Sequence, residues 1–282
     1  VGSEMCIRDR GKTVTITSSY SGADVSNYSV TDQSSTTANI TAKSLTVSGI
    51  TASNKTYDGS TSATLTGTAV YSGLVSGDIF TGSYTGVFAN ANVGTGKTVN
   101  ITPSYSGADV NNYSVTDQST TTANITAKAL TATASASNKT YDGGTTASTT
   151  LTFTGLVGSE TLGQTVGSTF DNKNVGSNKT VTVNSITLAD GSGLAANYSI
   201  SAGQTTTANI TAKSLTVSGI TASNKTYDGS TNATLDASLV AYSGLVGGDT
   251  FEGTYTGVFS DKNVGTGKTV TITSSYLSLI HI

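Results

Sequence analysis

An internal repeat of 85 residues constrains this chain more than any other feature. The octapeptide Thr-Thr-Ala-Asn-Ile-Thr-Ala-Lys ends at Lys43, Lys128 and Lys213, so the period is 85 residues in both intervals. The hexapeptide Asn-Lys-Thr-Tyr-Asp-Gly begins at Asn54, Asn138 and Asn224. Self-similarity at a fixed period indicates an array of like structural units.

The period divides the chain into two complete copies and two partial ones. The first copy spans 44–128 and the second copy spans 129–213. Residues 11–43 form an N-terminal partial copy that holds the C-terminal part of a unit, and 214–276 form a third copy that holds the N-terminal part. The decapeptide Gly-Lys-Thr-Val-Thr-Ile-Thr-Ser-Ser-Tyr occurs in both partial copies. We therefore expect the sequence to be a fragment of a longer array.

The two ends of the chain differ in composition from everything between them. The only Cys, Met and His and both Arg of the chain lie in residues 1–10 and 277–282. These segments can be back-translated into the two complementary strands of a sequencing-adapter end, and they resemble translated adapters. We therefore expect both tails to be non-native and exclude them from the fold argument.

The composition of the remaining chain favours an all-β fold. Charged residues make up only 11% of the chain and Gly occurs 32 times, which excludes a coiled coil or a helical bundle. The chain is rich in Thr, Val, Ile and Tyr. Apolar and polar residues alternate in short runs such as 61–70 and 79–88, and Gly and Asn separate the runs. Six or seven strands in a copy predict a small Ig-like β-sandwich. A β-grasp-like module or a β-helix coil is the alternative.

The junction between copies predicts how the array is assembled. Residues 125–128 continue into 129–130 with no Gly or Pro between them. Flexible linkers need Gly and Ser, so we expect a stiff junction and an elongated array.

Within one copy, the residue pattern predicts the core and one turn. Val99 and Ile101 should point inward from an alternating strand. The sequence Tyr-Asp-Gly at 57–59 predicts a turn in which the Gly takes a positive φ. Asp109 precedes Tyr113 by four residues, the spacing of a tyrosine corner, in which the ring packs in the core and the hydroxyl bonds nearby backbone.

The motifs taken together resemble one known family. The hexapeptide is followed in each copy by a Gly-Leu-Val segment, by Asn-Val-Gly and Lys-Thr-Val, and by Asn-Tyr-Ser where the copy extends that far. This combination resembles the YDG-type repeat of bacterial surface proteins of the filamentous-haemagglutinin and autotransporter adhesin kind, and it covers 11–276. The resemblance implies an exported, extracellular array associated with the outer membrane. It brings no catalytic residues with it.

Several kinds of site can be set aside from the residues. The segment 93–98, Val-Gly-Thr-Gly-Lys-Thr, is similar to a nucleotide-binding P-loop, but Ala91 stands where the first Gly is required and a strand pattern follows instead of a helix. A net charge of −3 without a basic patch argues against nucleic acid. No apolar run is long enough to be inserted in a membrane. Because the native region has no His or Cys and no recurring pair of carboxylates, we expect no enzyme activity and no cofactor.

Two turns rich in Asp and Asn are candidate metal-binding sites. Oxygen ligands at 171–174 and 261–263 are suited to Ca²⁺. The equivalent segment of the first copy, 90–92, has no carboxylate, and ordinary turn chemistry explains these residues. Calcium remains an alternative.

The sequence thus predicts structural stalk or spacer repeats of a bacterial cell-surface adhesin, which hold an adhesive tip away from the cell. The partners of each module would be its neighbours in the same chain. The alternative is that the modules bind carbohydrate, mucin or proteins of a host or environmental surface directly. Aromatic rings pack on sugar rings, so the candidate contacts are tyrosines near a Gly-rich loop: Tyr71, Tyr84, Tyr242 and Tyr255.

Overall fold

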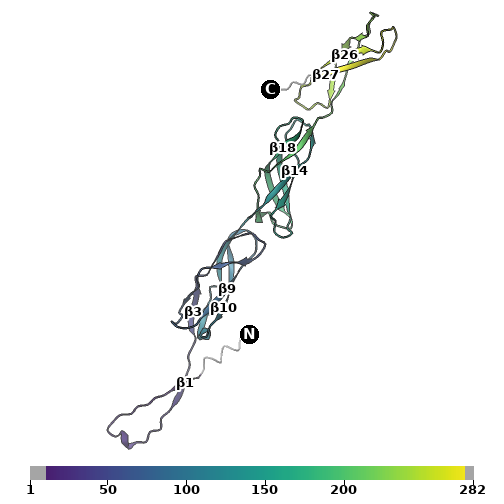
Figure 1. The fold of residues 1–282 in the computed structure, drawn as a ribbon. Helices are drawn as coiled ribbons and strands as arrows, with labels where there is room; N and C mark the ends of the chain where they lie inside the picture. The colour runs from purple at the N-terminus through teal and green to yellow at the C-terminus, as the bar shows by residue number, and fades with distance from the viewer. Residues whose placement is uncertain (1–10, 277–282) are drawn as a thin grey trace. The chain divides into compact units, whose positions relative to one another are not determined.

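The computed structural model describes residues 11–276, and the proposed non-native tails lie outside the described residues. The described chain consists of short strands and three single-turn 3₁₀ helices, which confirms the prediction of an all-β fold (Figure 1). The 3₁₀ helices are η1 (Val25–Asn27), η2 (Val110–Asn112) and η3 (Ala195–Asn197). Among residues 11–276, none of the helices has the length and apolar character needed to cross a membrane.

The chain separates into two compact units. The first unit runs to Ala129 and includes Leu194–Ser199 from the second copy. The second unit comprises Leu130–Gly193 and the chain from Ile200 onward. Each unit is described separately below.

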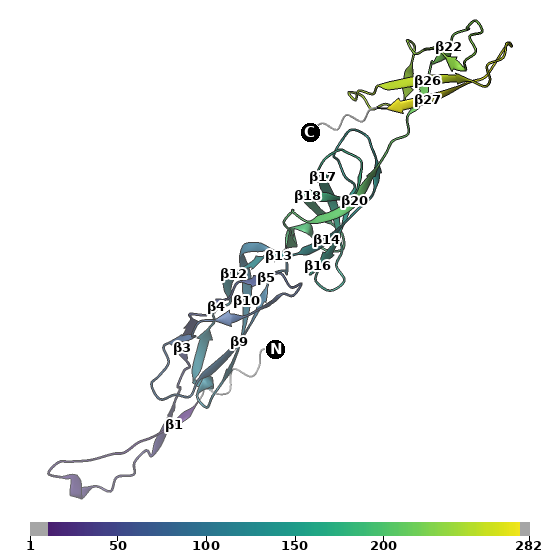
Figure 2. The ribbon, with the colours of Figure 1, turned by 45° about the horizontal axis from the view of Figure 1, so that its top comes forward.

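The first copy is built from three sheets. The largest has the strand order β5-β12-β10-β9-β6, of which Figure 2 labels β5, β12, β10 and β9. The two smaller ones have the orders β11-β3-β8 and β4-β7. The bounds are β3 (Lys43–Ser48), β4 (Thr51–Ala52), β5 (Lys55–Thr56), β6 (Ser62–Ala63), β7 (Leu65–Thr66), β8 (Val70–Ser72), β9 (Thr81–Phe88), β10 (Gly94–Ser106), β11 (Tyr113–Thr116) and β12 (Thr120–Thr126).

The second copy repeats this arrangement. Its main sheet has the order β15-β20-β18-β17, β14 pairs with β16, and β13 pairs with β19 in the first unit. The bounds are β13 (Lys128–Ala129), β14 (Thr131–Ala136), β15 (Lys139–Thr140), β16 (Thr149–Thr154), β17 (Leu162–Phe170), β18 (Gly176–Asp190), β19 (Tyr198–Ser199) and β20 (Thr205–Thr211).

The partial copies contain fewer strands. In the third copy the sheets have the orders β23-β26-β27, β21-β25 and β22-β24, and in the N-terminal partial copy β1 pairs with β2. The bounds are β1 (Lys12–Thr15), β2 (Ser35–Ala38), β21 (Thr216–Ser218), β22 (Thr221–Ala222), β23 (Asn232–Ala233), β24 (Leu235–Asp236), β25 (Ala241–Ser243), β26 (Gly253–Phe259) and β27 (Val270–Tyr276).

The last strands of a complete copy pair in parallel with its first strands. Strand β11 pairs in parallel with β3, and β12 pairs in parallel with β5 while its other edge joins β10. In the second copy, β20 lies between β15 and β18 in the same way. A copy is therefore closed only when its first and last strands are both present.

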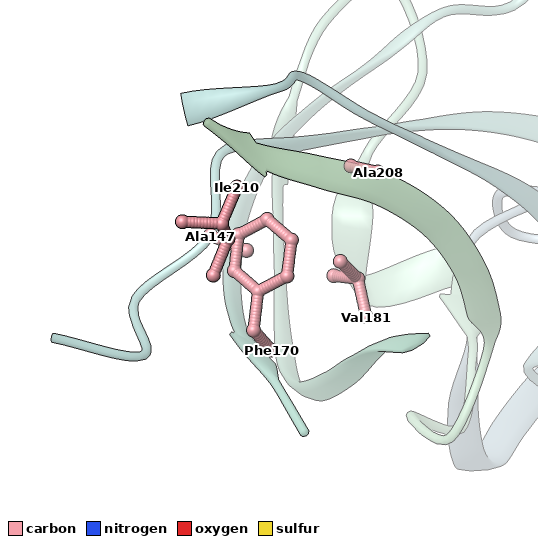
Figure 3. Packing of buried hydrophobic residues seen from close by; sticks show 5 residues of the cluster. All are labelled: Ala147, Phe170, Val181, Ala208 and Ile210. Atoms are coloured by element: carbon pink, nitrogen blue, oxygen red, sulfur yellow. The ribbon is translucent and has the colours of Figure 1, made fainter. Parts of the chain in front are cut away.

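Alternating apolar residues build the cores of the copies. Val99 and Ile101 are buried on β10, as the pattern predicts. In the second copy, Phe170 packs with four other buried residues from neighbouring segments, as Figure 3 shows: Ala147, Val181, Ala208 and Ile210. Each such large side chain stabilises the fold by about 1.5–3 kcal/mol when it is fully buried.

The segment 61–70 differs from its prediction as one continuous strand. It is broken into β6, β7 and the start of β8. Gly67 has a φ of 85°, and a Cβ at this position would lie 2.4 Å from the carbonyl oxygen of Gly49. The close approach of the two chains requires this Gly, and its left-handed backbone interrupts the strand.

Tyr113 follows the tyrosine-corner prediction only in part. Its ring is buried with Leu45 and Phe80, as predicted. Its hydroxyl, however, donates to Asp78 and accepts a hydrogen bond from the backbone N–H of Val75 at 2.9 Å. These partners lie more than thirty residues away in the chain. The hydroxyl therefore bonds to a loop that is distant in sequence and not to nearby backbone.

Candidate functional site

The hexapeptide Asn-Lys-Thr-Tyr-Asp-Gly is organised around its lysine. The ammonium of Lys55 lies 2.7 Å from the Oδ1 of Asp58 and 2.7 Å from the carbonyl oxygen of Ser60. It also donates to the carbonyl oxygen of Ser62 at 3.1 Å. On the core side it lies 5.7 Å from the centroid of the buried Phe88 ring. One cation thus holds the turn closed and fastens it to the main sheet.

The second copy reproduces this arrangement. Lys139 donates to Asp142 at 2.7 Å and to the carbonyl oxygens of Gly144 and Thr146 at 2.8 and 3.1 Å. The same ammonium lies 5.6 Å from the ring centroid of Phe170.

The third copy has the same arrangement around Lys225. Lys225 donates to Asp228 at 2.9 Å and to the carbonyl oxygens of Ser230 and Asn232 at 2.9 and 3.0 Å, and lies 5.6 Å from the Phe259 centroid. We call this repeated arrangement the lysine staple.

The other hexapeptide residues also have defined structural partners. The Oδ1 of Asn54 accepts the backbone N–H of Asn124 at 2.7 Å and so fixes β12 beside the turn. The backbone N–H of Ser60 donates to Asp58 at 2.8 Å, which forms an Asx turn, and Gly59 has a φ of 77° as the turn prediction requires. The hexapeptide side chains in these copies therefore form a turn and attach it to the neighbouring strand.

The staple changes the acidity of its carboxylates. The hydrogen bond from Lys225 lowers the pKa of Asp228 to about 2. Hydrogen bonds from Lys55 and Lys139 likewise lower the pKa of Asp58 and of Asp142 from 3.8. A carboxylate that is held ionised by a lysine is suited to an ion pair and is a poor general base near neutral pH.

Two of the four tyrosines proposed for glycan contact lie together in the first copy. The hydroxyl of Tyr84 donates to that of Tyr71 at 3.1 Å, and the Tyr71 hydroxyl accepts the backbone N–H of Gly82 at 3.0 Å. The Tyr84 ring meets Tyr105 edge-on with centroids 6.1 Å apart. Both rings pack against the core cluster that contains Val47.

The corresponding pair in the third copy is similar. The hydroxyls of Tyr242 and Tyr255 lie 2.8 Å apart, and Tyr242 meets Phe251 edge-on with centroids 5.0 Å apart. Burial and the bond to Tyr71 raise the pKa of Tyr84 to about 12, and the bond to Tyr242 raises that of Tyr255 to about 12. All four tyrosines are partly buried, and their contact with glycans stays a prediction.

In the segments considered for phosphate and calcium, a lysine side chain bonds to the neighbouring turn. In the P-loop-like segment, Gly94 begins the strand β10, as the strand pattern predicts, and Lys97 donates to the Oδ1 of Asn90 at 2.6 Å. At the turn 171–174, Lys179 lies 2.9 Å from Asp171 and 2.7 Å from the Oδ1 of Asn172. Within residues 11–276, no group of three or more His, Cys, Asp or Glu side chains is arranged to hold a metal.

The tyrosine of the hexapeptide is buried inside the first unit. Tyr57 meets Tyr198 edge-on, with ring centroids 5.4 Å apart. The neighbouring Asn197 is buried, accepts the backbone N–H of Val93 at 2.9 Å and donates to Asn92 at 3.1 Å. Sequence reasoning missed this role of Asn197, although the recurrence of Asn-Tyr-Ser pointed to the segment.

The second unit contains a related contact. The hydroxyl of Tyr141 donates to Asp249 at 2.7 Å, and Lys173 lies 3.5 Å from the same carboxylate. In both complete copies, then, the hexapeptide tyrosine contacts residues that come later in the chain.

The third copy carries an open groove of about 750 Å³. One wall is the hexapeptide segment 224–227, and the other includes Lys268 and Val270 at the start of β27. In the first copy, β12 lies between the equivalent segments. The groove therefore coincides with the position of the last strand of a complete copy.

These features define a class of protein: a tandem array of all-β repeats in which the repeated motif is a structural turn. The family model for the YDG domain matches residues 41–123, 126–208 and 211–278, and the chain belongs to this family. The three matches begin 85 residues apart, in agreement with the sequence period. Comparisons with curated proteins and with solved structures gave no match.

Proposed function

We propose that these YDG repeats are the stalk of a bacterial cell-surface adhesin and that they hold an adhesive tip away from the cell. The observation that carries the proposal is the lysine staple, which is present with the same partners in all three hexapeptides. A motif whose side chains are engaged in fixing its own turn is suited to a load-bearing repeat rather than to catalysis.

The contacts beyond the turn support the same role. The hexapeptide tyrosines of the two complete copies meet residues from later in the chain, at Tyr198 and at Asp249. Short connections without Gly or Pro and repeated nearest-neighbour contacts are what a spacer needs, because each repeat then stabilises the next. Export to the cell surface suits a native region without Cys, whose chain carries no thiol to be oxidised on the way.

Stretching single molecules of the chain between its ends tests the mechanical role. A stalk of equal modules should unfold in discrete, equal force steps, each lengthening the chain by up to about 290 Å for 85 residues. A single step for the whole chain, or extension without force peaks, would contradict the proposal. Small-angle scattering gives a second readout, because a compact globule of this length has a radius of gyration of about 19 Å and a stalk should exceed it clearly.

Surface location is tested on cells. An adhesive domain joined to the outer end of the array should be detected by antibody at the cell surface, and adhesion should fall when the repeats are removed while the domain and anchor are kept. Unchanged adhesion after this removal would count against the spacer role.

A further inference from the structure

Six residues of the second complete copy belong to the first unit. Leu194–Ser199 group with the chain up to Ala129, whereas the rest of the second copy lies in the second unit. The segment contains η3 and β19, and β19 pairs in parallel with β13, the strand that follows the first copy. Addition of a short strand whose side chains enter specific positions is a common mode of peptide recognition.

Asn197 makes the most specific contact of this segment. Its side chain is buried, with only 2% of the residue exposed. Its Oδ1 accepts the backbone N–H of Val93 at 2.9 Å, and its Nδ2 donates to the Oδ1 of Asn92 at 3.1 Å. The side-chain amide is therefore matched both as an acceptor and as a donor, and an apolar side chain of the same size would make neither bond.

Two tyrosines form the apolar part of the same contact. Tyr57 is 6% exposed and Tyr198 is 5% exposed, and their rings meet edge-on with centroids 5.4 Å apart. Tyr57 belongs to the hexapeptide of the first copy and Tyr198 to the second copy. The burial of the hexapeptide ring therefore depends in part on the copy that follows.

Three of the recurring motifs lie on the two sides of this contact. The hexapeptide supplies Tyr57 and the Asn-Val-Gly motif supplies Asn92, both from the first copy. The Asn-Tyr-Ser motif of the second copy supplies Asn197 and Tyr198. Both copies are complete, so each side of the contact has its whole repeat around it.

We propose that the Asn-Tyr-Ser motif is the element by which a YDG repeat is recognised by the repeat before it, and that Asn197 sets the register of this contact. A shift of the segment by one residue would bury the amide without its partners, which is costly. A buried asparagine that fixes register is a well-attested use of a buried polar group. The partner of the hexapeptide face is therefore the next copy of the same chain. This goes beyond the spacer role, which requires joined repeats but no particular recognition residue.

Hydrogen exchange of the full chain, followed by NMR, tests the recognition. Asn197→Ala is a change in the second copy, but it should speed the exchange of the Val93 amide in the first copy by about tenfold, because this amide loses its acceptor. The amide of Val181, in the core of the second copy, should keep its rate. An unchanged rate at Val93, or an equal increase at Val181, would overturn the proposal.

A matched asparagine serves as the control. Asn184 is exposed in the second copy and donates to Thr169 of the same copy at 3.0 Å. Asn184→Ala should leave the exchange of Val93 unchanged. If Asn184→Ala speeds this exchange as much as Asn197→Ala does, the effect is not due to recognition.

Variants of Asn92 test the contact from the other side and leave the buried position intact. Asn92→Asp keeps an acceptor for the Nδ2 of Asn197, whereas Asn92→Leu does not. The amides of 197–199 should stay protected in Asn92→Asp and should exchange several-fold faster in Asn92→Leu. Equal rates in the two variants would exclude a role for this hydrogen bond.

A disulfide trap tests the register. Ala129 lies opposite Ser199 in the parallel pair, and both residues are exposed. In a Cys6→Ser background, Ala129→Cys with Ser199→Cys should oxidise much faster than Ala129→Cys with Ser201→Cys. Adding Asn197→Leu should reduce this preference, and an undiminished preference would show that Asn197 does not set the register. These outcomes concern contacts within the chain in solution, so they do not depend on display at a cell surface.

Discussion

Lys55 and Asp58 form an ion pair of 2.7 Å between the ammonium and Oδ1, and the Lys55 side chain is mostly buried while that of Asp58 is mostly exposed. The pair recurs at Lys139–Asp142 and Lys225–Asp228. An exposed ion pair alone contributes little to stability. The importance of the staple lies in the two carbonyl oxygens and the aromatic ring that the same ammonium contacts.

Replacing the staple lysine should therefore cost more than replacing its aspartate. Lys55→Met keeps the aliphatic stem but leaves the carbonyl oxygens of Ser60 and Ser62 without their donor. We expect a loss of about 1–3 kcal/mol in the free energy of unfolding of the first copy, since hydrogen bonds from a charged group contribute about this much. Hydrogen exchange of the amides in β9 and β10 measures it.

Two control variants accompany this experiment. Asp58→Asn should cost less than Lys55→Met because it removes only the exposed partner. Lys262→Met, at an exposed lysine, should have little effect. A larger loss for Asp58→Asn than for Lys55→Met would contradict the role assigned to the lysine.

Acid should weaken the staple in a defined range. The folded-state pKa of Asp58, Asp142 and Asp228 is lowered from 3.8, to about 2 for Asp228, chiefly by the lysine hydrogen bonds. A lowered carboxyl pKa adds stability that is complete above the unfolded pKa and disappears as the pH falls through the folded value. The melting temperature should therefore drop as the pH goes from 3.8 to about 2.

A triple variant checks the source of this drop. With Asp58→Asn, Asp142→Asn and Asp228→Asn combined, the melting temperature should be lower at neutral pH and should depend less on acid. An equally steep acid dependence in the triple variant would show that other groups are responsible.

The sequence predicts the local features of a copy well. Alternation placed Val99 and Ile101 in the core, and the Asp-Gly pair predicted the turn with a positive φ at Gly59. These features depend on neighbouring residues, whose periodicity is visible in the chain. The all-β class followed from the same patterns.

Long-range partners could not be predicted in this way. The hydroxyl of Tyr113 bonds to Asp78, which is 35 residues away, and the parallel pairing of β11 with β3 joins the two ends of a copy. A single sequence gives the spacing of strands but not their order in a sheet. The contact of Lys55 with the Phe88 ring is of the same kind, because Phe88 lies on β9, a strand that begins well after the turn.

Alkaline pH should lower the stability of the copies that contain the tyrosine pairs. Burial and the hydroxyl bond raise the pKa of Tyr84 to about 12 from 10.0. A tyrosine whose pKa is raised in the folded state favours the neutral form, so its contribution is complete below pH 10.0 and is lost as the pH rises to about 12. Thermal unfolding followed by tyrosinate absorbance should show this loss.

The matched variants separate ionisation from packing. Tyr84→Phe keeps the ring against Tyr105 but has no proton to lose, so it should reduce the alkaline sensitivity. Tyr28→Phe, which changes an exposed ring, should not alter the alkaline sensitivity. If Tyr84→Phe leaves the alkaline profile unchanged, the pair does not control it.

Two glycines with similar backbone conformations should respond differently to the same substitution. Gly49 has a φ of 86° and Gly229 a φ of 76°, so Ala is strained at both. A Cβ at Gly49 would lie 2.6 Å from the carbonyl oxygen of Thr68, whereas a Cβ at Gly229 meets nothing within 4 Å. Left-handed backbone costs a residue with a Cβ about 1–2 kcal/mol, and a backbone clash adds to this because a neighbouring strand must move. Gly229→Ala should therefore lower the free energy of unfolding by about 1–2 kcal/mol, and Gly49→Ala should lower it by clearly more. Denaturant unfolding of the two variants, with local hydrogen exchange to assign each loss to its copy, measures the difference; equal losses would mean that the chains at Gly49 are not as close as the structure places them.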